Sequence, residues 1–265
     1  MKRGKVLAVG LLLSLGLAVA GCSSSPADGA DHSLSDVTSK GELVIATEGT
    51  YKPFSYHEGG SGSLTGYDVE VAEAVAAKLG VKAKFQETQF DGIFAGLDAK
   101  RFDVIANQIS INPDRQKKYD FSAPYTVSAG VIVTKQSNDS IKSFDDLKGK
   151  TTAQSLTSNW YKLAQQSGAT VQSVEGWAQS VALLQQDRVD AVVNDKLTYL
   201  DFVKNTPNAG LKIAAETTDK SESAFALRKG STALSEAINK ALTELASDGT
   251  LSKLSKKYFD ADVSK

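Results

Sequence analysis

Two stretches of the sequence decide the fold: FDGIFAGLDAKRFDVIANQ at residues 90–108 and WAQSVALLQQDRVDAVVND at residues 177–195. At a constant offset of 87 residues, they place aromatic on aromatic, arginine on arginine, aspartate on aspartate and asparagine on asparagine. Each stretch has the pattern of a helix, a tight turn and a short apolar strand that ends in two polar residues. One unit used twice predicts a protein of two similar lobes. Because Arg-x-Asp before a strand is also a common turn composition, chance similarity is the alternative.

The sequence around these stretches alternates strand and helix patterns. Short apolar runs predict strands at 43–47, 83–87, 103–106, 130–134, 151–154, 170–174, 191–193 and 224–227. Amphipathic stretches predict helices at 68–79, 89–100, 159–167, 178–186, 197–204, 233–247 and 250–258. Strand, helix and strand in this rhythm are typical of parallel sheets with crossover helices, so the predicted fold class is α/β.

The polar pairs at the ends of the two repeated strands predict a ligand site. These pairs are Asn107-Gln108 in the first stretch and Asn194-Asp195 in the second. In open α/β sheets, ligands bind beyond the carboxyl ends of the strands. If the two lobes face each other, the two pairs line opposite walls of one cleft.

The N-terminus has the pattern of an export signal. A short cationic start is followed by an apolar run from Val6 to Ala20, which is too short and too rich in glycine for a membrane span. Small residues then precede Cys22, the only cysteine in the chain, as in the bacterial lipobox. We therefore expect residues 1–21 to be a lipoprotein signal peptide and Cys22 to carry lipid that holds the protein at a membrane surface. An ordinary signal peptide with an incidental cysteine is the alternative.

Charge and composition exclude some functions and divide the mature chain. Removal of residues 1–21 leaves 27 basic and 31 acidic residues with no basic stripe, so nucleic-acid binding has no electrostatic support. Small and polar residues follow Cys22, and we expect residues 22–39 to be a flexible tether. The remaining residues, about 40–262, are enough for one large or two small domains.

Charged and capping residues near the predicted cleft suit a zwitterionic amino acid. Arg115 follows the first repeated strand and offers a bidentate fork to a carboxylate. Thr157 and Ser158 precede a predicted helix, whose free N–H groups favour an anion. Asp195 is a candidate partner for an ammonium group. The alternatives are a solvated arginine at a helix start, simple capping by Thr157 and Ser158, and an Asp195 that caps the next helix.

Ordered motifs along the chain resemble a known family. The stretches EGTYKPF at 48–54, GYDVE at 66–70, FDV at 102–104 and YDFS at 119–122, together with Arg115, are similar to the signatures of the family 3 solute-binding proteins of ABC importers. These proteins bind polar amino acids, and the resemblance covers essentially the whole mature domain. It implies a monomeric extracytoplasmic binding protein that delivers its ligand to a membrane permease and its ATPase subunits.

The resemblance also implies a two-lobed fold of the periplasmic-binding-protein type II class. Each lobe is expected to be a mainly parallel sheet flanked by helices, with two hinge crossings between the lobes. Lobe 1 would comprise residues 40–128 and 222–262, and lobe 2 residues 129–221. The ligand would bind in a cleft that closes on it.

By the same resemblance, Ser110 and Arg115 bind the α-carboxylate with help from N–H groups near Thr157 and Ser158, and Asp195 holds the α-ammonium. The other positions that the family pattern places near the ligand are Glu48, Tyr51, Phe90, Asn107 and Gln108. Two departures from the pattern are Asn107-Gln108, where small serines are common, and Leu156, where glycine is usual.

Four segments are most similar to the L-cystine-binding lipoproteins within the family: ANQ at 106–108, QSLTSN at 154–159, VEGWAQ at 174–179 and NDKL at 194–197. L-Cystine is therefore the favoured ligand, and glutamine, histidine and arginine are the alternatives. Cystine carries two amino-acid heads, and Glu48 with Gln108 would address the distal one.

An enzyme or an adhesin on the same fold is the competing prediction. The mature chain has only two histidines, His32 and His57, which leaves little for histidine acid–base or metal chemistry. There is no G-x-S-x-G elbow, and Gly149-Lys150-Thr151 lacks the glycine that a P-loop needs upstream. We expect no enzyme activity, no cofactor and no metal, with a carboxylate-based, dehydratase-like enzyme as the catalytic alternative.

Overall fold

The computed structural model describes residues 31–265 as one compact unit. The predicted signal peptide and Cys22 lie outside the described residues. The predicted tether over 22–39 is wrong for its second part, because helix α1 (Ser33–Lys40) lies there. Val37 of α1 is fully buried in the main core, and Leu34 packs against the same core. Two apolar residues one helical turn apart are enough to hold this short helix against the domain.

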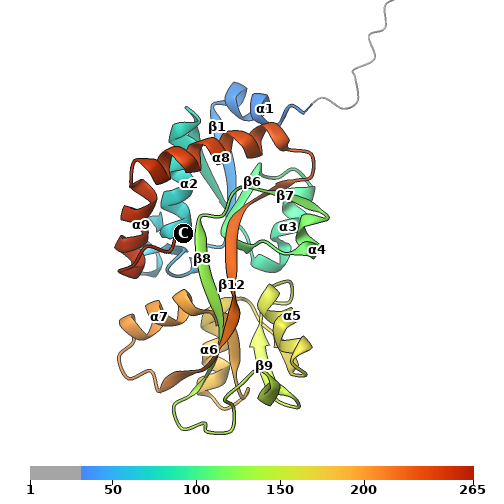
Figure 1. The fold of residues 1–265 in the computed structure, drawn as a ribbon, viewed down its shortest axis with the longest axis vertical. Helices are drawn as coiled ribbons and strands as arrows, with labels where there is room; N and C mark the ends of the chain where they lie inside the picture. The colour runs from blue at the N-terminus through green and yellow to red at the C-terminus, as the bar shows by residue number, and fades with distance from the viewer. Residues whose placement is uncertain (1–30) are drawn as a thin grey trace, which may run out of the picture. The chain divides into compact units, whose positions relative to one another are not determined.

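The first lobe is built on three parallel strands. Strand β1 (Glu42–Thr47) lies between β5 (Lys82–Glu87) and β6 (Val104–Ser110), and helices α2 (Tyr67–Lys78) and α3 (Phe90–Asp98) connect them (Figure 1). The remaining elements of this lobe are β2 (Thr50–Tyr51), β3 (Ser55–His57), β4 (Leu64–Thr65), α4 (Pro113–Gln116), β7 (Tyr119–Phe121), α8 (Thr232–Ser247) and α9 (Thr250–Phe259).

The second lobe repeats this plan. Strands β9 (Thr151–Gln154) and β10 (Thr170–Ser173) are parallel, and a parallel bridge from Thr152 to Ala191 joins β9 to the start of β11 (Val192–Asp195). Three helices accompany these strands: α5 (Asn159–Gln166), α6 (Gly176–Gln185) and α7 (Lys196–Asn205).

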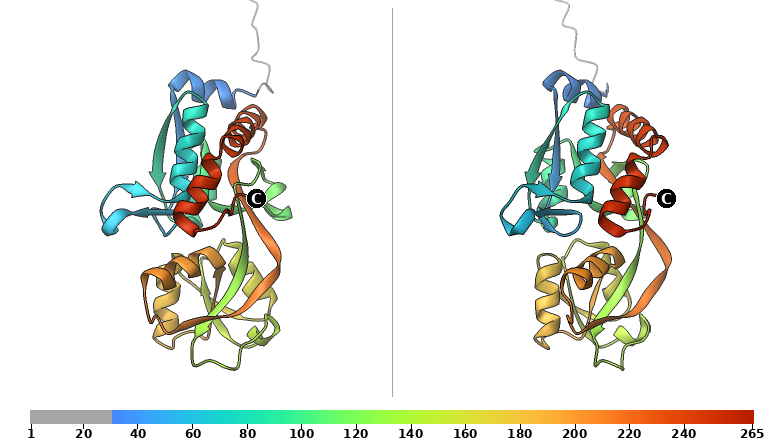
Figure 2. Two further views of the ribbon diagram at one scale, coloured as in Figure 1. Left: turned by 60° about the vertical axis from the view of Figure 1, so that its left-hand side comes forward. Right: turned by 90° about the vertical axis from the view of Figure 1, so that its left-hand side faces the viewer.

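Two long strands run between the lobes. Strand β8 (Thr126–Lys135) and strand β12 (Leu211–Arg228) pair antiparallel and extend from one group of elements to the other (Figures 1 and 2). Each also supplies an antiparallel strand to a lobe, since β12 pairs with β6 and β8 pairs with β11. The α/β, two-lobed fold with two crossings is therefore confirmed. The exact residue boundaries of the lobes, 40–128 with 222–262 and 129–221, stay a prediction.

The repeated stretches of sequence have the same structural role in each lobe. The Asp103 carboxylate accepts a hydrogen bond from the Val44 N–H at 2.9 Å, and the Asp190 carboxylate accepts one from the Thr151 N–H at 2.7 Å. In each lobe, the aspartate that follows the helix thus accepts a hydrogen bond from the backbone of a neighbouring parallel strand, β1 in the first lobe and β9 in the second. The turn before it takes the same left-handed conformation at Lys100 and Asp187, both with φ of 58°. One helix–turn–strand unit is thus used twice.

Candidate ligand-binding site

A cavity, with about 460 Å³ of empty space when its opening to solvent is included, lies at the carboxyl ends of strands from both lobes. The first lobe contributes residues after β1, at the start of α3 and on β6, and the second lobe contributes residues from β9, α5, α6 and β11. The lining residues are Glu48, Tyr51, Phe90, Asn107, Gln108, Gln154, Ser155, Ser158, Asn159, Trp160, Gly176, Trp177, Ser180, Val193 and Asn194. The structure thus brings the polar ends of both repeated strands to one cavity.

Two further hollows adjoin this cavity. One, of about 870 Å³, is lined by Arg115 and Thr157 and shares Ser158 and Asn159 with the cavity. The other, of about 680 Å³, is lined by Glu175 and shares Glu48 and Gly176 with the cavity. Because the two hollows share different residues with it, the cavity has an arginine-lined end and an acidic end.

The predicted site residues fall into three groups. Glu48, Tyr51, Phe90, Asn107, Gln108 and Ser158 line the cavity itself. Arg115 and Thr157 line the hollow beside it. Ser110 and Asp195 line neither space, but the Ser110 carbonyl accepts a bond from Arg115 and Asp195 directly follows the lining residue Asn194. Sequence reasoning did not place Gln154, Gly176, Trp177 or Ser180 at the site.

Arg115 is a buried cation whose guanidinium has no acidic partner among the described residues. Only 8% of its surface is exposed, and its guanidinium donates to the carbonyl oxygens of Ser110 at 3.0 Å and Thr157 at 3.3 Å. The guanidinium lies 5.2 Å from the centre of the Phe94 ring. Burial lowers the pKa of Arg115 to about 10, so it is still protonated at neutral pH. A buried cation held only by neutral groups is ready to receive a carboxylate.

The loop before α5 joins the two lobes. The Asp91 carboxylate on α3 accepts hydrogen bonds from the Thr157 N–H at 2.8 Å, the Thr157 hydroxyl at 2.9 Å and the Leu156 N–H at 3.2 Å. Ser158 caps α5 by accepting from the Tyr161 N–H at 3.0 Å. The N–H of Thr157, which the family pattern assigns to the ligand, is therefore given to Asp91 in this structure.

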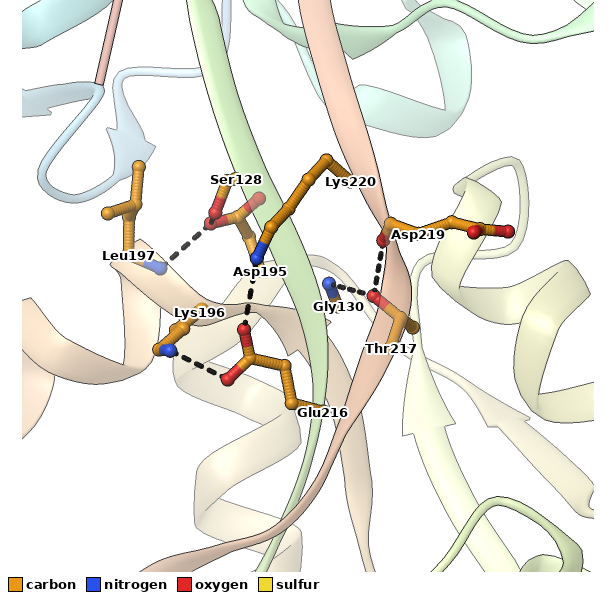
Figure 3. A network of polar contacts seen from close by, with 9 residues as sticks. All are labelled: Ser128, Gly130, Asp195, Lys196, Leu197, Glu216, Thr217, Asp219 and Lys220. Carbon is orange, nitrogen blue, oxygen red and sulfur yellow. Dashed lines mark hydrogen bonds and ion pairs between the residues drawn. The ribbon is translucent and has the colours of Figure 1, made fainter. Parts of the chain in front are cut away.

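Asp195 has the capping role that was its alternative interpretation. Its Oδ1 accepts from the Leu197 N–H at 2.8 Å, at the start of α7, and from the Ser128 hydroxyl at 2.7 Å (Figure 3). Burial raises the pKa of Asp195 to about 6. The nearby Lys196 and Lys220 both bind Glu216 instead, so no described cation pairs with this carboxylate.

Glu48 is held at the acidic end of the cavity by Asn107. The Asn107 amide donates to the Glu48 carboxylate at 2.6 Å, and its oxygen accepts from the Glu48 N–H at 2.8 Å. Burial raises the pKa of Glu48 to about 7, with a smaller opposing effect of the Asn107 bond and a further increase from the charges of Glu175 and Asp91. A cationic ligand group here would restore the ionised form.

Gln108 is fixed by a buried aspartate. With its backbone in the left-handed region, at φ of 48°, it donates to Asp68 from its N–H at 2.7 Å and from its side-chain Nε2 at 2.6 Å. The same Nε2 donates to the Thr126 hydroxyl at 3.1 Å. Burial raises the pKa of Asp68 to about 7 against the effect of these bonds. Because the amide nitrogen is fully used, the Gln108 oxygen is left for the cavity.

Hydrogen bonds across the cavity hold the lobes together. Besides the Asp91 and Arg115 bonds to Thr157, the Tyr51 hydroxyl donates to Asn194 at 2.9 Å and accepts from Thr198 at 3.1 Å. An ion pair between Asp114 and Lys162 spans the same gap. These contacts describe a closed arrangement of the two lobes. In the part of the chain that the structure describes, no group of three or more His, Cys, Asp or Glu side chains could hold a metal ion.

Residues 43–261 match the family of bacterial extracellular solute-binding proteins, family 3, and the chain belongs to this family. The L-cystine-binding protein TcyA of Bacillus subtilis (strain 168) is 54% identical over 229 residues, which cover 86% of this chain and 85% of that protein. The L-cystine solute receptor of Neisseria gonorrhoeae, solved in the unliganded open conformation, is 47% identical with a TM-score of 0.60, covering 88% of this chain and 99% of that one. An ancestral arginine-binding protein bound to glutamine is 41% identical with a TM-score of 0.78, covering 83% and 98%.

These similarities fix the class of the protein. It is a solute-binding protein of the extracellular family that serves ABC importers, and its relatives are binding proteins rather than enzymes. The family prediction made from the motifs is confirmed. The TM-score is higher for the ligand-bound ancestral protein than for the open receptor, although the open receptor is more similar in sequence. This agrees with the hydrogen bonds across the cavity in indicating closed lobes.

Proposed function

We propose that this chain is the lipid-anchored substrate-binding subunit of an amino-acid ABC importer and that its ligand is L-cystine. The observation that carries the proposal is a cavity with charged groups at both ends, in a chain 54% identical to an L-cystine-binding protein. An arginine without an acidic partner among the described residues borders one end, and the half-buried Glu48 borders the other. A ligand with a single amino-acid head would use only one of them.

The first head of the ligand binds on the Arg115 side. Its α-carboxylate takes the Arg115 guanidinium, with Ser110 and the N–H groups near Thr157 and Ser158 beside it, and its α-ammonium takes Asp195. Arg115 and Asp195 are buried and have no partner of opposite charge among residues 31–265, which supports this assignment, since each gains such a partner from the ligand. Tyr51 and Phe90 flank the ligand.

The second head binds at the acidic end of the cavity. Its ammonium faces Glu48 and the free oxygen of Gln108, both of which line the cavity. Contacts from Asn107 and Gln108 on one lobe and from Ser158 on the other let the ligand stabilise the closed arrangement, because only a ligand that touches both lobes shifts the equilibrium between open and closed forms.

The protein is anchored through Cys22 and passes its ligand to a permease with ATPase subunits. The lipobox pattern supports the anchor, and no helix among residues 31–265 is long and apolar enough to span a membrane. The anchor is tested by labelling cells with a palmitate analogue: the wild-type chain should take up label and pellet with membranes, and Cys22→Ser should do neither. A labelled Cys22→Ser chain would contradict the proposal.

Calorimetric titration of residues 23–265, freed of endogenous ligand, tests the ligand. We expect one-to-one binding of L-cystine that is much tighter than binding of L-cysteine under reductant, glutamine, histidine or arginine. A preference for another amino acid would retain the importer subunit and reject cystine. Binding of no amino acid by the folded protein would reject both.

A further inference from the structure

Three polar side-chain atoms on the cavity residues are buried without a hydrogen-bond partner among the described residues. They are Gln108 Oε1, Gln154 Nε2 and Trp177 Nε1. The three residues are 8%, 3% and 7% exposed, respectively. Buried polar atoms without a partner are rare and destabilising in native proteins, so such atoms in a binding cavity indicate groups of the ligand. One of the three atoms is an acceptor and two are donors.

Gln154 presents a donor because its oxygen is already used. It is the last residue of β9, and its Oε1 accepts a hydrogen bond from the Thr152 hydroxyl at 3.0 Å. That bond orients the amide and leaves Nε2 for the cavity. The position is at the carboxyl end of a strand, where ligands of open α/β sheets bind.

Trp177 presents a donor because its indole N–H has no acceptor among the described residues. It lies in the first turn of α6, and its ring packs edge-on against Phe202 with the ring centres 5.6 Å apart. The indole N–H donates and never accepts, so its partner in the ligand is an acceptor. Trp177 takes the place in the second repeat that Phe90 has in the first, and both line the cavity.

We infer that Gln154 and Trp177 are the donor pair for the second carboxylate of a ligand with two amino-acid heads. This rests on the proposed function, in which the first carboxylate binds Arg115 and the second ammonium faces Glu48 and Gln108. A carboxylate supplies two acceptor oxygens, one for each free N–H. The pair selects against arginine, whose guanidinium carries only donors, and against glutamine, whose amide supplies one acceptor oxygen.

The test compares two ligands that differ only in the second carboxylate. L-Cystine has it, and the mixed disulfide of L-cysteine with cysteamine lacks it but keeps the second ammonium. Both are titrated calorimetrically into the wild-type protein and into Gln154→Leu and Trp177→Phe, which keep most of the side-chain volume. Gln165→Leu, at an exposed position of α5, is the matched control. Thermal unfolding without ligand shows whether each variant is folded.

Wild-type protein should bind cystine about 100-fold more tightly than the mixed disulfide, since two hydrogen bonds to a charged group are lost. Each variant should bind cystine about tenfold more weakly than the wild-type protein does. For the mixed disulfide, the dissociation constant of each variant should stay within about threefold of the wild-type value. Equal losses for both ligands, or no loss for cystine, would overturn the donor pair while the importer proposal stands. Failure of the wild-type protein to bind cystine would be seen without any variant and would reject the proposed ligand and the donor pair together.

Discussion

Replacement of Arg115 by methionine is the sharpest test of how the first head of the ligand binds. Methionine keeps an unbranched apolar stem of similar length and removes the guanidinium. In the structure the guanidinium donates to two carbonyl oxygens and has no described acidic partner, so the charge is available to a ligand carboxylate. Its pKa of about 10 keeps it charged throughout the range from pH 5 to pH 9.

The expected loss follows from the bonds that the guanidinium would make. A hydrogen bond between charged groups contributes about 1.5–3 kcal/mol net, and a bidentate pair about 3–5 kcal/mol. The dissociation constant for cystine should therefore rise by a factor of about 10²–10⁴. The free energy of unfolding without ligand should change much less, because the lost bonds to the Ser110 and Thr157 carbonyls are offset by removal of an unpaired buried charge.

Titration calorimetry measures the dissociation constant, and thermal unfolding with and without cystine measures both stabilities. Arg188→Met is the control, because Arg188 is an exposed arginine of the second repeat outside the cavity lining. The control should bind as wild type does. If Arg115→Met binds cystine within about threefold of wild type, the carboxylate does not bind this arginine and the assignment of the first head is wrong.

Three further predictions concern the acidic groups. Asp195→Asn keeps a side chain that can cap α7 but removes the charge, so cystine binding measured by calorimetry should weaken about 10- to 100-fold with little loss of thermal stability; unchanged binding would exclude Asp195 as the ammonium partner. Asp91→Ala removes the three bonds to Leu156 and Thr157 that hold the lobes closed, and small-angle scattering should show a larger radius of gyration without ligand; an unchanged radius would mean that these bonds do not determine closure. Burial raises the pKa of Glu48 and Asp68 to about 7 and that of Asp195 to about 6, above the value of about 4 in an unfolded chain. The unliganded folded state therefore holds protons that the unfolded state releases, and its free energy of unfolding should fall as the pH rises from about 4 to about 7, as denaturant titrations will show. A rise across that window would contradict these pKa shifts.

The fold was readable from the sequence because its main determinants are local. Short apolar runs and helical patterns predicted the parallel strands and the long helices of the two lobes, and the repeated stretch predicted their common unit. Of the long strand β12 they predicted only residues 224–227, because residues 216–223 are all polar or charged and form no apolar run. Helix α1 was not predicted because Leu34 and Val37 are its only large apolar residues. Strands β2, β3 and β4 were not predicted because strands of two or three residues are too short to show a periodic pattern.

The candidate site was readable only in part. Strand ends and the family resemblance led to Asn107 and Gln108, and the same rule applied to β9 would have led to Gln154. The repeat offset would have led from Phe90 to Trp177. No sequence pattern predicted the hydrogen bonds between Asp91 and Thr157. These residues are 66 positions apart in the chain and lie on different lobes, so they meet only when the lobes close.

The strands β8 and β12 have a consequence for engineering the protein as a ligand sensor. Their ladder is interrupted between Glu216 and Lys220, where Gly130 bonds instead to the Thr217 hydroxyl at 3.0 Å (Figure 3). A methyl group added to Gly130 would lie 2.5 Å from the ring of Trp160, which lines the cavity. Substitutions at the exposed Thr218, which lies within this interruption and outside the cavity lining, therefore offer a way to adjust the dynamic range of a fluorescent reporter without changing the ligand contacts.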